Sequence, residues 1–209
     1  SAKTFRFRDH QHDAEDALEY LRRLDSVDAH RLVLVAHSQG AKAAASMAQG
    51  DPGVKALVLL APALLPVVEG VLEQLLRAAA LRRAMFDWVG YARLKREHDS
   101  HRDCFSILEQ EPKSDAFCFA QGVGLQALRV ERAQAASAVQ ALFGSRIPTL
   151  MVHGALDINV DVAASIRRIA RASNDHLHLR VVPNAGHLLR DLQKPDASVA
   201  FHPDVKASI

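Results

Sequence analysis

The stretch LVLVAHSQGAKAAASMA, residues 32–48, joins an apolar run to an alanine-rich run through small residues around Ser38. The apolar part, Leu32–Ala36, is too short for a stable helix and too uniformly apolar for a half-exposed strand. It therefore predicts a strand buried on both faces of a parallel sheet. The residues after Gly40 favour a helix that ends at Gly50. Ser38 is thus expected on a sharp strand-to-helix turn at the carboxyl edge of the sheet.

A serine at such a turn can carry nucleophilic chemistry if it has partners. Strand and helix pass close to each other there, which requires small residues two positions on either side, and Ala36 and Gly40 supply them. A serine hydroxyl is a weak nucleophile at neutral pH, so Ser38 needs a histidine as general base and a carboxylate that fixes the histidine tautomer. In an open α/β sheet these partners are expected just after later strands.

Two later segments provide these partners. In TLMVHGALDINV, residues 149–160, Asp157 comes a few residues after a predicted strand. In LRVVPNAGHLL, residues 179–189, His187 follows the next predicted strand. The order Ser38, Asp157, His187 along the chain is one of the known orders of a nucleophile, an acid and a base in such a triad.

Other ionisable residues near these segments fit the two roles less well. His37 is expected to point away from the serine on a sharp turn, and His153 is expected to support the acid loop. Asp161 is expected to cap the helix that follows it, and Asp191 lies beyond the histidine. The sequence therefore favours Asp157 as the acid.

Strands and helices alternate over most of the chain. We expect a short edge strand at Phe5–Arg8, further strands at 31–36, 56–60, 149–152 and 177–182, and helices at about 13–24, 41–50 and 162–172. This alternation predicts right-handed crossovers and an open, mostly parallel α/β sheet.

The interval from Leu64 to Arg146 breaks the alternation, because it has helical periodicity and no convincing strand. We therefore expect a helical cap at 64–146, between a first part of the α/β core at 1–63 and a second part at 147–209. The first half of the cap is basic, which suits either an anionic substrate or membrane surface, or a solvated helix face. Interspersed acidic residues favour the solvated face. The basic residues are Arg77, Arg82, Arg83, Arg93, Lys95, Arg96 and Arg102.

The composition restricts the class of protein. A chain of 209 residues with 49% hydrophobic residues can bury the core of one domain. A formal net charge of +2 does not favour a nucleic-acid partner, and no phosphate-binding glycine loop or zinc-finger spacing occurs. We expect no nucleic acid, no cofactor and no metal. Four histidines have spacings like those of metal ligands but lack accompanying ligands: His10, His12, His176 and His178.

No segment of the sequence has the pattern of a membrane span or a signal peptide. The longest apolar run, Ala56–Val68, contains Pro62 and Pro66 and is too short to cross a bilayer. The two cysteines, Cys104 and Cys118, form no disulfide framework and fit a reducing compartment, with one surface bridge left open. We expect no stable membrane insertion and a cytoplasmic location.

At these motifs the sequence resembles the α/β-hydrolase family over residues 13–192. AHSQG looks like the nucleophile elbow, HGALD like the acid loop and NAGH like the histidine loop. The chain is most similar to the serine aminopeptidase or lysophospholipase-like esterase branch, in which a helix like DAEDALEYLRR precedes the nucleophile strand. Ala36 stands where the family more often has glycine, which is a small change.

The resemblance implies an α/β-hydrolase fold with a Ser38, His187 and Asp157 triad and the backbone N–H of Gln39 in the oxyanion hole. The implied reaction is hydrolysis of an ester, thioester or amide of a small acyl substrate through an acyl-enzyme, without a cofactor, most like a carboxylesterase or lipase. Two alternatives remain: a catalytically silent binding module on the same fold, and an acyltransferase that uses an alcohol or amine in place of water.

The front of the chain departs from that family. Its members have several strands before the nucleophile strand and an early loop, often with His-Gly, that provides a second oxyanion donor; this sequence has neither. The nucleophile strand is normally central, so an apolar sheet edge is expected to be exposed here. We therefore expect either that the chain is the carboxyl-terminal part of a longer hydrolase, or that a second copy or a partner chain covers the edge.

Overall fold

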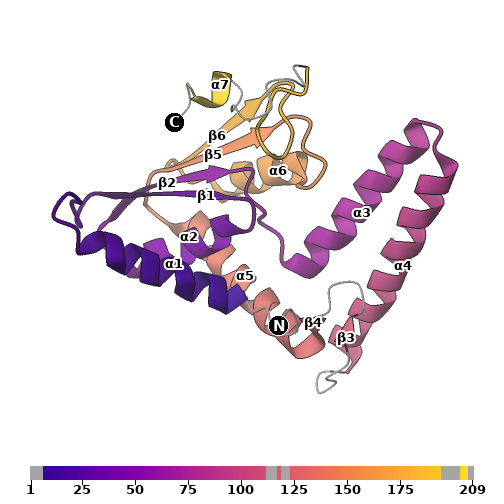
Figure 1. Ribbon diagram of the computed structural model, residues 1–209, viewed down its shortest axis with the longest axis horizontal. Coiled ribbons are helices and arrows are strands. Elements are labelled where there is room, and N and C mark those ends of the chain that lie inside the picture. Colours follow the sequence, from indigo (N-terminus) through magenta and orange to yellow (C-terminus); the bar gives the residue numbers. More distant parts are fainter. Residues whose placement is uncertain (1–6, 112–116, 119–122, 194–202, 207–209) are drawn as a thin grey trace. The chain divides into compact units, whose positions relative to one another are not determined.

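The computed structural model describes residues 7–111, 117–118, 123–193 and 203–206 (Figure 1). The chain divides into two compact units. One, here called the hairpin unit, comprises Ser1–Asp9 and Leu65–Ala136. The other, here called the sheet unit, comprises His10–Leu64 and Ser137–Ile209.

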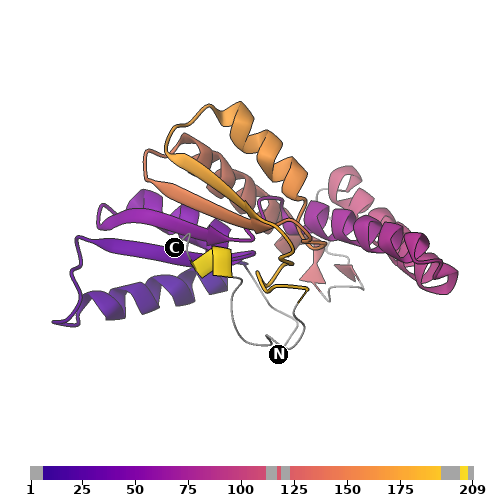
Figure 2. The same ribbon diagram turned by 90° about the horizontal axis from the view of Figure 1, so that it is seen from above.

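The sheet unit is built on a four-stranded parallel sheet, as the alternation of strands and helices predicted. The order across the sheet is β1 (Leu32–His37), β2 (Val54–Leu60), β5 (Thr149–Gly154) and β6 (Leu177–Val182). Each strand pairs in parallel with its neighbour. Figure 2 shows the four strands side by side in this order.

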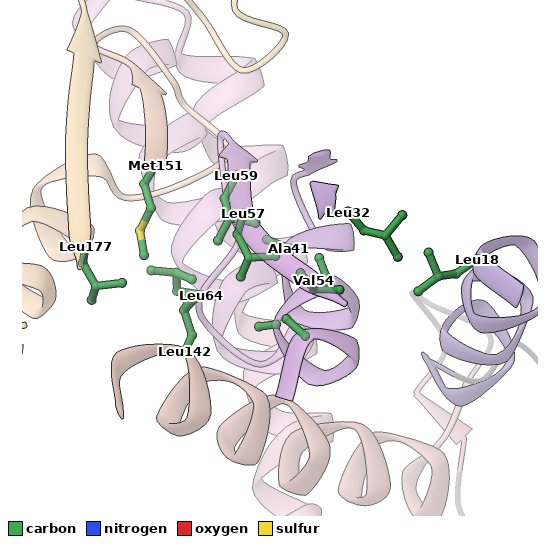
Figure 3. Close-up of a cluster of buried hydrophobic side chains, with 13 residues drawn as sticks. Leu18, Leu32, Ala41, Val54, Leu57, Leu59, Leu64, Leu142, Met151 and Leu177 are labelled. Atoms are coloured by element: carbon green, nitrogen blue, oxygen red, sulfur yellow. The ribbon is translucent and has the colours of Figure 1, made fainter. Parts of the chain in front are cut away.

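The helices of the sheet unit cover one face of the sheet (Figure 1). They are α1 (Phe7–Arg22), α2 (Gly40–Gly50), the end of α5 (Leu125–Gly144) and α6 (Val162–Ala172). Successive strands all advance in the same direction across the sheet, and right-handed crossovers then place the connecting helices on the same face. Their apolar side chains meet those of the strands in one core cluster, drawn in Figure 3, which includes Leu18, Leu57, Leu59, Leu142 and Met151.

On the opposite face of the sheet, the described residues cover only the later strands. Val58, Leu60, Val152 and Val182 pack there against the loop after β6 and against α7 (Pro203–Lys206), the yellow element of Figure 2. This second cluster does not include β1.

The first strand is therefore half-exposed, and the expectation that it is buried on both faces is wrong. Val33 and Val35 are 55% and 58% exposed, whereas Leu32 is buried against the helices. The physical reason is the position of β1 at the edge of the sheet, where β2 is its one partner among the described residues. In the part of the chain that the structure describes, the apolar edge expected from the sequence is exposed.

The hairpin unit consists of α3 (Val67–Ala84), α4 (Trp88–Gln110) and the first part of α5. A small apolar core, which includes Val68, Phe105 and Leu125, holds the three helices together. The sequence predicted no strand in this interval, but two short antiparallel strands occur, β3 (Phe117–Cys118) and β4 (Val123–Gly124). With two residues each, they are too short to give a periodic signal.

Two other expectations concern the start of the chain and the cysteines. Phe7 and Arg8 lie in α1, so the expected edge strand at Phe5–Arg8 is wrong for these two residues, and the others lie outside the described residues. Cys104, on α4, is disulfide-bonded. No helix in the described parts of the chain is both long and apolar enough to cross a membrane.

Candidate active site

Ser38 lies on a tight turn between β1 and α2, as predicted. Its φ of 55° is in the left-handed region, which costs a non-glycine residue about 1–2 kcal/mol. Hydrogen bonds to the neighbouring strand hold this conformation: the N–H of Ser38 donates to the carbonyl of Leu60 at 2.9 Å. The carbonyl of Ser38 accepts from the N–H groups of Ala41 and Ala63. The strained backbone therefore fixes the place of the serine hydroxyl at the carboxyl end of the sheet.

The imidazole of His187 joins the serine to the carboxylate. His187 Nε2 lies 3.0 Å from Ser38 Oγ, and His187 Nδ1 lies 2.8 Å from Asp157 Oδ2. A carboxylate beside Nδ1 favours the tautomer in which Nδ1 carries the proton and donates it, so that Nε2 accepts from the serine hydroxyl. The three residues that sequence order suggested are thus hydrogen-bonded in series.

Asp157 is held as a carboxylate by its surroundings. Its side chain is fully buried, and Oδ1 accepts hydrogen bonds from the backbone N–H groups of Asn159 at 2.8 Å and Val160 at 3.0 Å. Burial acts to raise the pKa of Asp157, but the hydrogen bonds from His187, Val160 and Asn159 outweigh it, and the pKa lies below its ordinary value. The carboxylate is therefore charged at neutral pH and oriented toward the imidazole.

Close packing between the acid loop and the histidine loop sets the distance between Asp157 and His187. The loops are joined by a hydrogen bond from the N–H of Leu156 to the carbonyl of Ala185. A Cβ on Gly154 would lie 2.3 Å from that same carbonyl oxygen, so no side chain fits at this position. This role of Gly154 in loop packing could not be found from a pattern along one segment.

The two rival histidines lie near the site without contacting the serine hydroxyl. His37 lies beside His187 instead: its Nε2 is 3.0 Å from the His187 carbonyl oxygen. His153 is fully buried beneath the acid loop, and neither of its ring nitrogens has a hydrogen-bond partner among the described residues. Burial lowers the pKa of His153 to about 4, so its ring is neutral at pH 7.

The rival carboxylates have other partners. Asp161 Oδ1 accepts a hydrogen bond from the N–H of Ala164 at 2.8 Å, which confirms the predicted cap of α6. Asp191 Oδ1 accepts from the N–H of Gln193, and the backbone of Asp191 pairs with that of Ala185 across the histidine loop. Neither carboxylate has a hydrogen bond to His187 in the described part of the chain.

Gln39 follows the serine at the N-cap position of α2, with φ −64° and ψ −26°. Its backbone N–H lies at the start of the helix, where the first N–H groups have no acceptor within the helix and the helix dipole favours negative charge. This position suits an oxyanion donor. The described residues contain no group of three or more His, Cys, Asp or Glu side chains that could hold a metal ion.

Known structures share this arrangement of the chain. They include the α/β-hydrolase GrgF from Penicillium sp. sh18, with a TM-score of 0.53 and 16% identity, covering 93% of this chain and 70% of that one. Est1E from Butyrivibrio proteoclasticus has a TM-score of 0.50 and 18% identity over 85% of this chain and 60% of its own. A monoacylglycerol lipase from Paleococcus ferrophilus has a TM-score of 0.50 and 14% identity over 92% and 72%. The likeness shows the α/β-hydrolase fold.

The sequence comparison agrees with the fold. No match was found among curated protein sequences. The family described as serine aminopeptidase, S33, matches residues 2–191, which is most of the chain and contains every residue of the candidate site. These are hydrolases, as the motifs around Ser38, Asp157 and His187 implied. The chain therefore belongs to the serine aminopeptidase S33 family of α/β-hydrolases.

Proposed function

We propose that this protein is a serine hydrolase that cleaves an ester, thioester or amide bond of a small-molecule acyl substrate. Ser38 is the nucleophile, His187 the general base and then the general acid, and Asp157 orients the imidazole. The observation that carries the proposal is the continuous hydrogen-bonded series from Ser38 Oγ through His187 to Asp157. The strained left-handed backbone at Ser38 supports it, because such strain is concentrated at functional sites.

In the proposed reaction Ser38 Oγ attacks the substrate carbonyl carbon while its proton passes to His187 Nε2. The carbonyl electron pair moves onto oxygen, which the N–H of Gln39 stabilises. Collapse of this intermediate forms the acyl-serine and expels the alcohol, thiol or amine, which takes the proton from His187. A water molecule then gives its proton to His187 and attacks the acyl-serine. The acid is released and Ser38 recovers its hydroxyl proton.

Among these substrate classes we favour carboxylic esters, as for a carboxylesterase or lipase. Two of the structurally similar proteins are named for such activities, an esterase domain of a Rhodothermus marinus protein and the monoacylglycerol lipase, and Est1E has also been solved with ferulic acid bound. An ester is also less demanding to cleave than an amide, since the leaving alkoxide needs less assistance than an amine. No metal or organic cofactor is required by the proposed chemistry.

One observation favours the silent binding module as a second candidate. Gln39 is the one oxyanion donor that we assign among the described residues, and loss of one of two such donors lowers turnover about 100- to 1000-fold. A site with a single donor can retain the hydrogen-bonded series and still turn over slowly. The two candidates differ in whether any hydrolysis depends on Ser38.

Hydrolysis of short p-nitrophenyl esters tests the proposal. Wild-type protein should release nitrophenol with a burst equal to the amount of enzyme, and Ser38→Ala should show no burst and no turnover above the uncatalysed rate. Equal rates in the two proteins would contradict the proposal and favour the silent module. Adding glycerol or hydroxylamine as a competing nucleophile separates hydrolysis from acyl transfer, because only a transferase would convert most of the acyl group to the new ester or amide.

A further inference from the structure

A second region of interest is the turn between α3 and α4, in the hairpin unit. The two helices run side by side and meet at Met85–Asp87 (Figure 1). The N–H groups of Met85, Phe86 and Asp87 all donate to carbonyls in the last turns of α3. The carboxylate of Asp87 accepts from the N–H of Gly90 at 2.8 Å and so caps α4. We call residues 81–89 the hairpin tip.

The hairpin tip exposes a group of large apolar side chains. Phe86 is 80% exposed and Val89 is 82% exposed. Three further large apolar residues of the tip are also exposed: Leu81, Met85 and Trp88. A single exposed apolar residue is ordinary, but here five lie within nine residues of one turn, and groups of exposed apolar side chains mark surfaces that bind a partner or a membrane.

The backbone of Phe86 strengthens this argument. Its φ of 57° is left-handed, at the position after a helix where glycine is the usual residue because a Cβ is unfavourable there. Phenylalanine therefore costs the hairpin backbone free energy and also leaves an aromatic ring in water. Neither the local backbone nor core packing explains why phenylalanine stands at position 86. A role of the exposed ring in binding explains it.

Charge around the tip identifies the kind of partner. Residues 77–96 contain six basic side chains and one acidic side chain, Asp87, whereas the whole chain has a formal net charge of only +2. Three of the six are ion-paired: Arg82 with Asp87, Arg77 with Glu73 and Lys95 with Asp99. The other three, Arg83, Arg93 and Arg96, are exposed and form no ion pair with the described residues. The excess positive charge is thus local to the distal part of the hairpin.

A groove between α3 and α4 lies beside the hairpin tip. Its volume is about 480 Å³, and its lining joins alanines and aromatic rings to the charged ends of Arg83 and Lys95. Trp88 and Tyr91 pack edge to face there, with ring centroids 6.2 Å apart. Tryptophan and tyrosine are enriched where apolar and aqueous phases meet, because their rings are apolar and carry one polar group.

We propose that the hairpin tip docks on an anionic lipid surface, with Phe86 and Val89 entering the boundary between headgroups and acyl chains. Arg83, Arg93 and Arg96 meet the lipid phosphates. The exposed apolar side chains suit the acyl chains of such a surface, and the basic side chains around them suit its negative charge. A second copy of the chain would bring an equally basic tip and is disfavoured by repulsion. The acidic residues that favoured a solvated face in the sequence lie mostly outside residues 77–96.

Trp88 is the only tryptophan of the chain, so its fluorescence reports directly on the hairpin tip. The protein is titrated with vesicles of phosphatidylcholine alone and of phosphatidylcholine with phosphatidylglycerol. The proposal predicts a blue shift of the emission, quenching by brominated lipid chains and co-sedimentation with the anionic vesicles. Binding should weaken steeply with added salt, since screening acts on the charge attraction.

Two tip variants locate the binding surface. Phe86→Gly removes the ring and relieves the left-handed backbone, so the hairpin stays folded while vesicle partitioning falls about tenfold. The double variant Arg83→Gln and Arg93→Gln should weaken partitioning about tenfold or more, only on anionic vesicles. The matched controls, Tyr20→Ala on α1 and Arg167→Gln on α6, alter exposed residues of the sheet unit and should bind like wild type.

Several results would overturn this inference. They are an unchanged Trp88 emission with anionic vesicles, equal binding to neutral and anionic vesicles, or binding that survives both tip variants. A blue shift that depends on protein concentration without vesicles would assign the tip to a second copy instead. Ser38→Ala should bind vesicles like wild type, so this test is independent of the proposed catalytic function.

Discussion

His37 Nε2 lies 3.0 Å from the backbone carbonyl oxygen of His187 and donates a hydrogen bond to it. The two rings are also in contact, with centroids 4.9 Å apart and planes inclined by 56°. The residue before the serine, at the end of β1, therefore holds the histidine loop in place. This assigns His37 a positioning role, in which it acts on the candidate base through the backbone.

The first prediction concerns that hydrogen bond. His37→Ala should lower kcat about fivefold to tenfold, since one hydrogen bond contributes about 1 kcal/mol, and should leave KM nearly unchanged. His37→Gln, whose amide can still donate, should restore most of the loss. Steady-state ester hydrolysis measures both. A role limited to folding is excluded if the two variants unfold at the same urea concentration, and equal kcat in all three proteins would contradict a positioning role.

Gly154 gives a second prediction, because its backbone touches the histidine loop. A Cβ there would lie 2.3 Å from the carbonyl oxygen of Ala185, so Gly154→Ala must push the loop away from Asp157. We expect a loss of about 1–3 kcal/mol of unfolding free energy and a large loss of activity. The control is Gly144→Ala at the end of α5, where nothing lies within 4 Å of the added Cβ and stability should be unchanged or slightly higher. Similar effects of both changes would show that the two loops do not pack as described.

His153 predicts how stability depends on pH. The pKa of its buried ring is lowered to about 4, against an ordinary value of 6.5. Above pH 6.5 the ring is neutral in both folded and unfolded protein. As the pH falls from 6.5 toward 4, only the unfolded chain binds the proton, so the folded state loses up to about 3 kcal/mol. Urea unfolding at a series of pH values measures this slope.

His153→Leu is the variant that tests this attribution, because leucine fills the space without a titrating ring. The slope between pH 6.5 and 4 should become shallower, and stability at pH 7 should not fall, since neither ring nitrogen of His153 has a hydrogen-bond partner among the described residues. His178→Gln, at an exposed position of β6, is the control and should keep the wild-type slope. An unchanged slope in His153→Leu would assign the pH dependence to other groups.

The edge of the sheet predicts self-association. Val33 and Val35 are more than half exposed on a strand whose outer backbone edge pairs with none of the described residues. Such an apolar edge is a template for pairing with another chain. Light scattering should therefore show a mass that rises with concentration, and Val33→Thr with Val35→Thr should reduce the rise, since threonine keeps the strand propensity. Val130→Thr, exposed on a helix, should not. A monomer at all concentrations would contradict the prediction.

Local patterns in the sequence were sufficient for much of the sheet unit. The bounds of α6 and β6 agree with the expected ranges, and the other strands of the sheet begin and end within two residues of them. The turn at Ser38 was predictable because small residues, an apolar run and a helical run adjoin it. Asp157 and His187 were predictable because parallel strands bring their carboxyl ends to one edge.

Features that depend on neighbours distant in the chain were not predictable. The exposure of Val33 follows from which strand forms the sheet edge, and the contact between His37 and His187 joins residues 150 positions apart. The burial of Lys42, which is 1% exposed on α2, has no signal in an alanine-rich helix pattern. The left-handed turn at Phe86 could not be predicted for another reason, because the residue there is not the glycine that usually marks such a position.

Labelling of the protein with a fluorophosphonate, followed by peptide mass mapping, shows whether Ser38 is an activated nucleophile. The reagent bonds covalently only to a serine whose proton is taken up by an assembled base. We predict one adduct, on Ser38, that is absent in Ser38→Ala and formed far more slowly in His187→Ala. An adduct elsewhere, or none in the folded wild-type protein, would contradict the assignment of Ser38 and His187 as nucleophile and base.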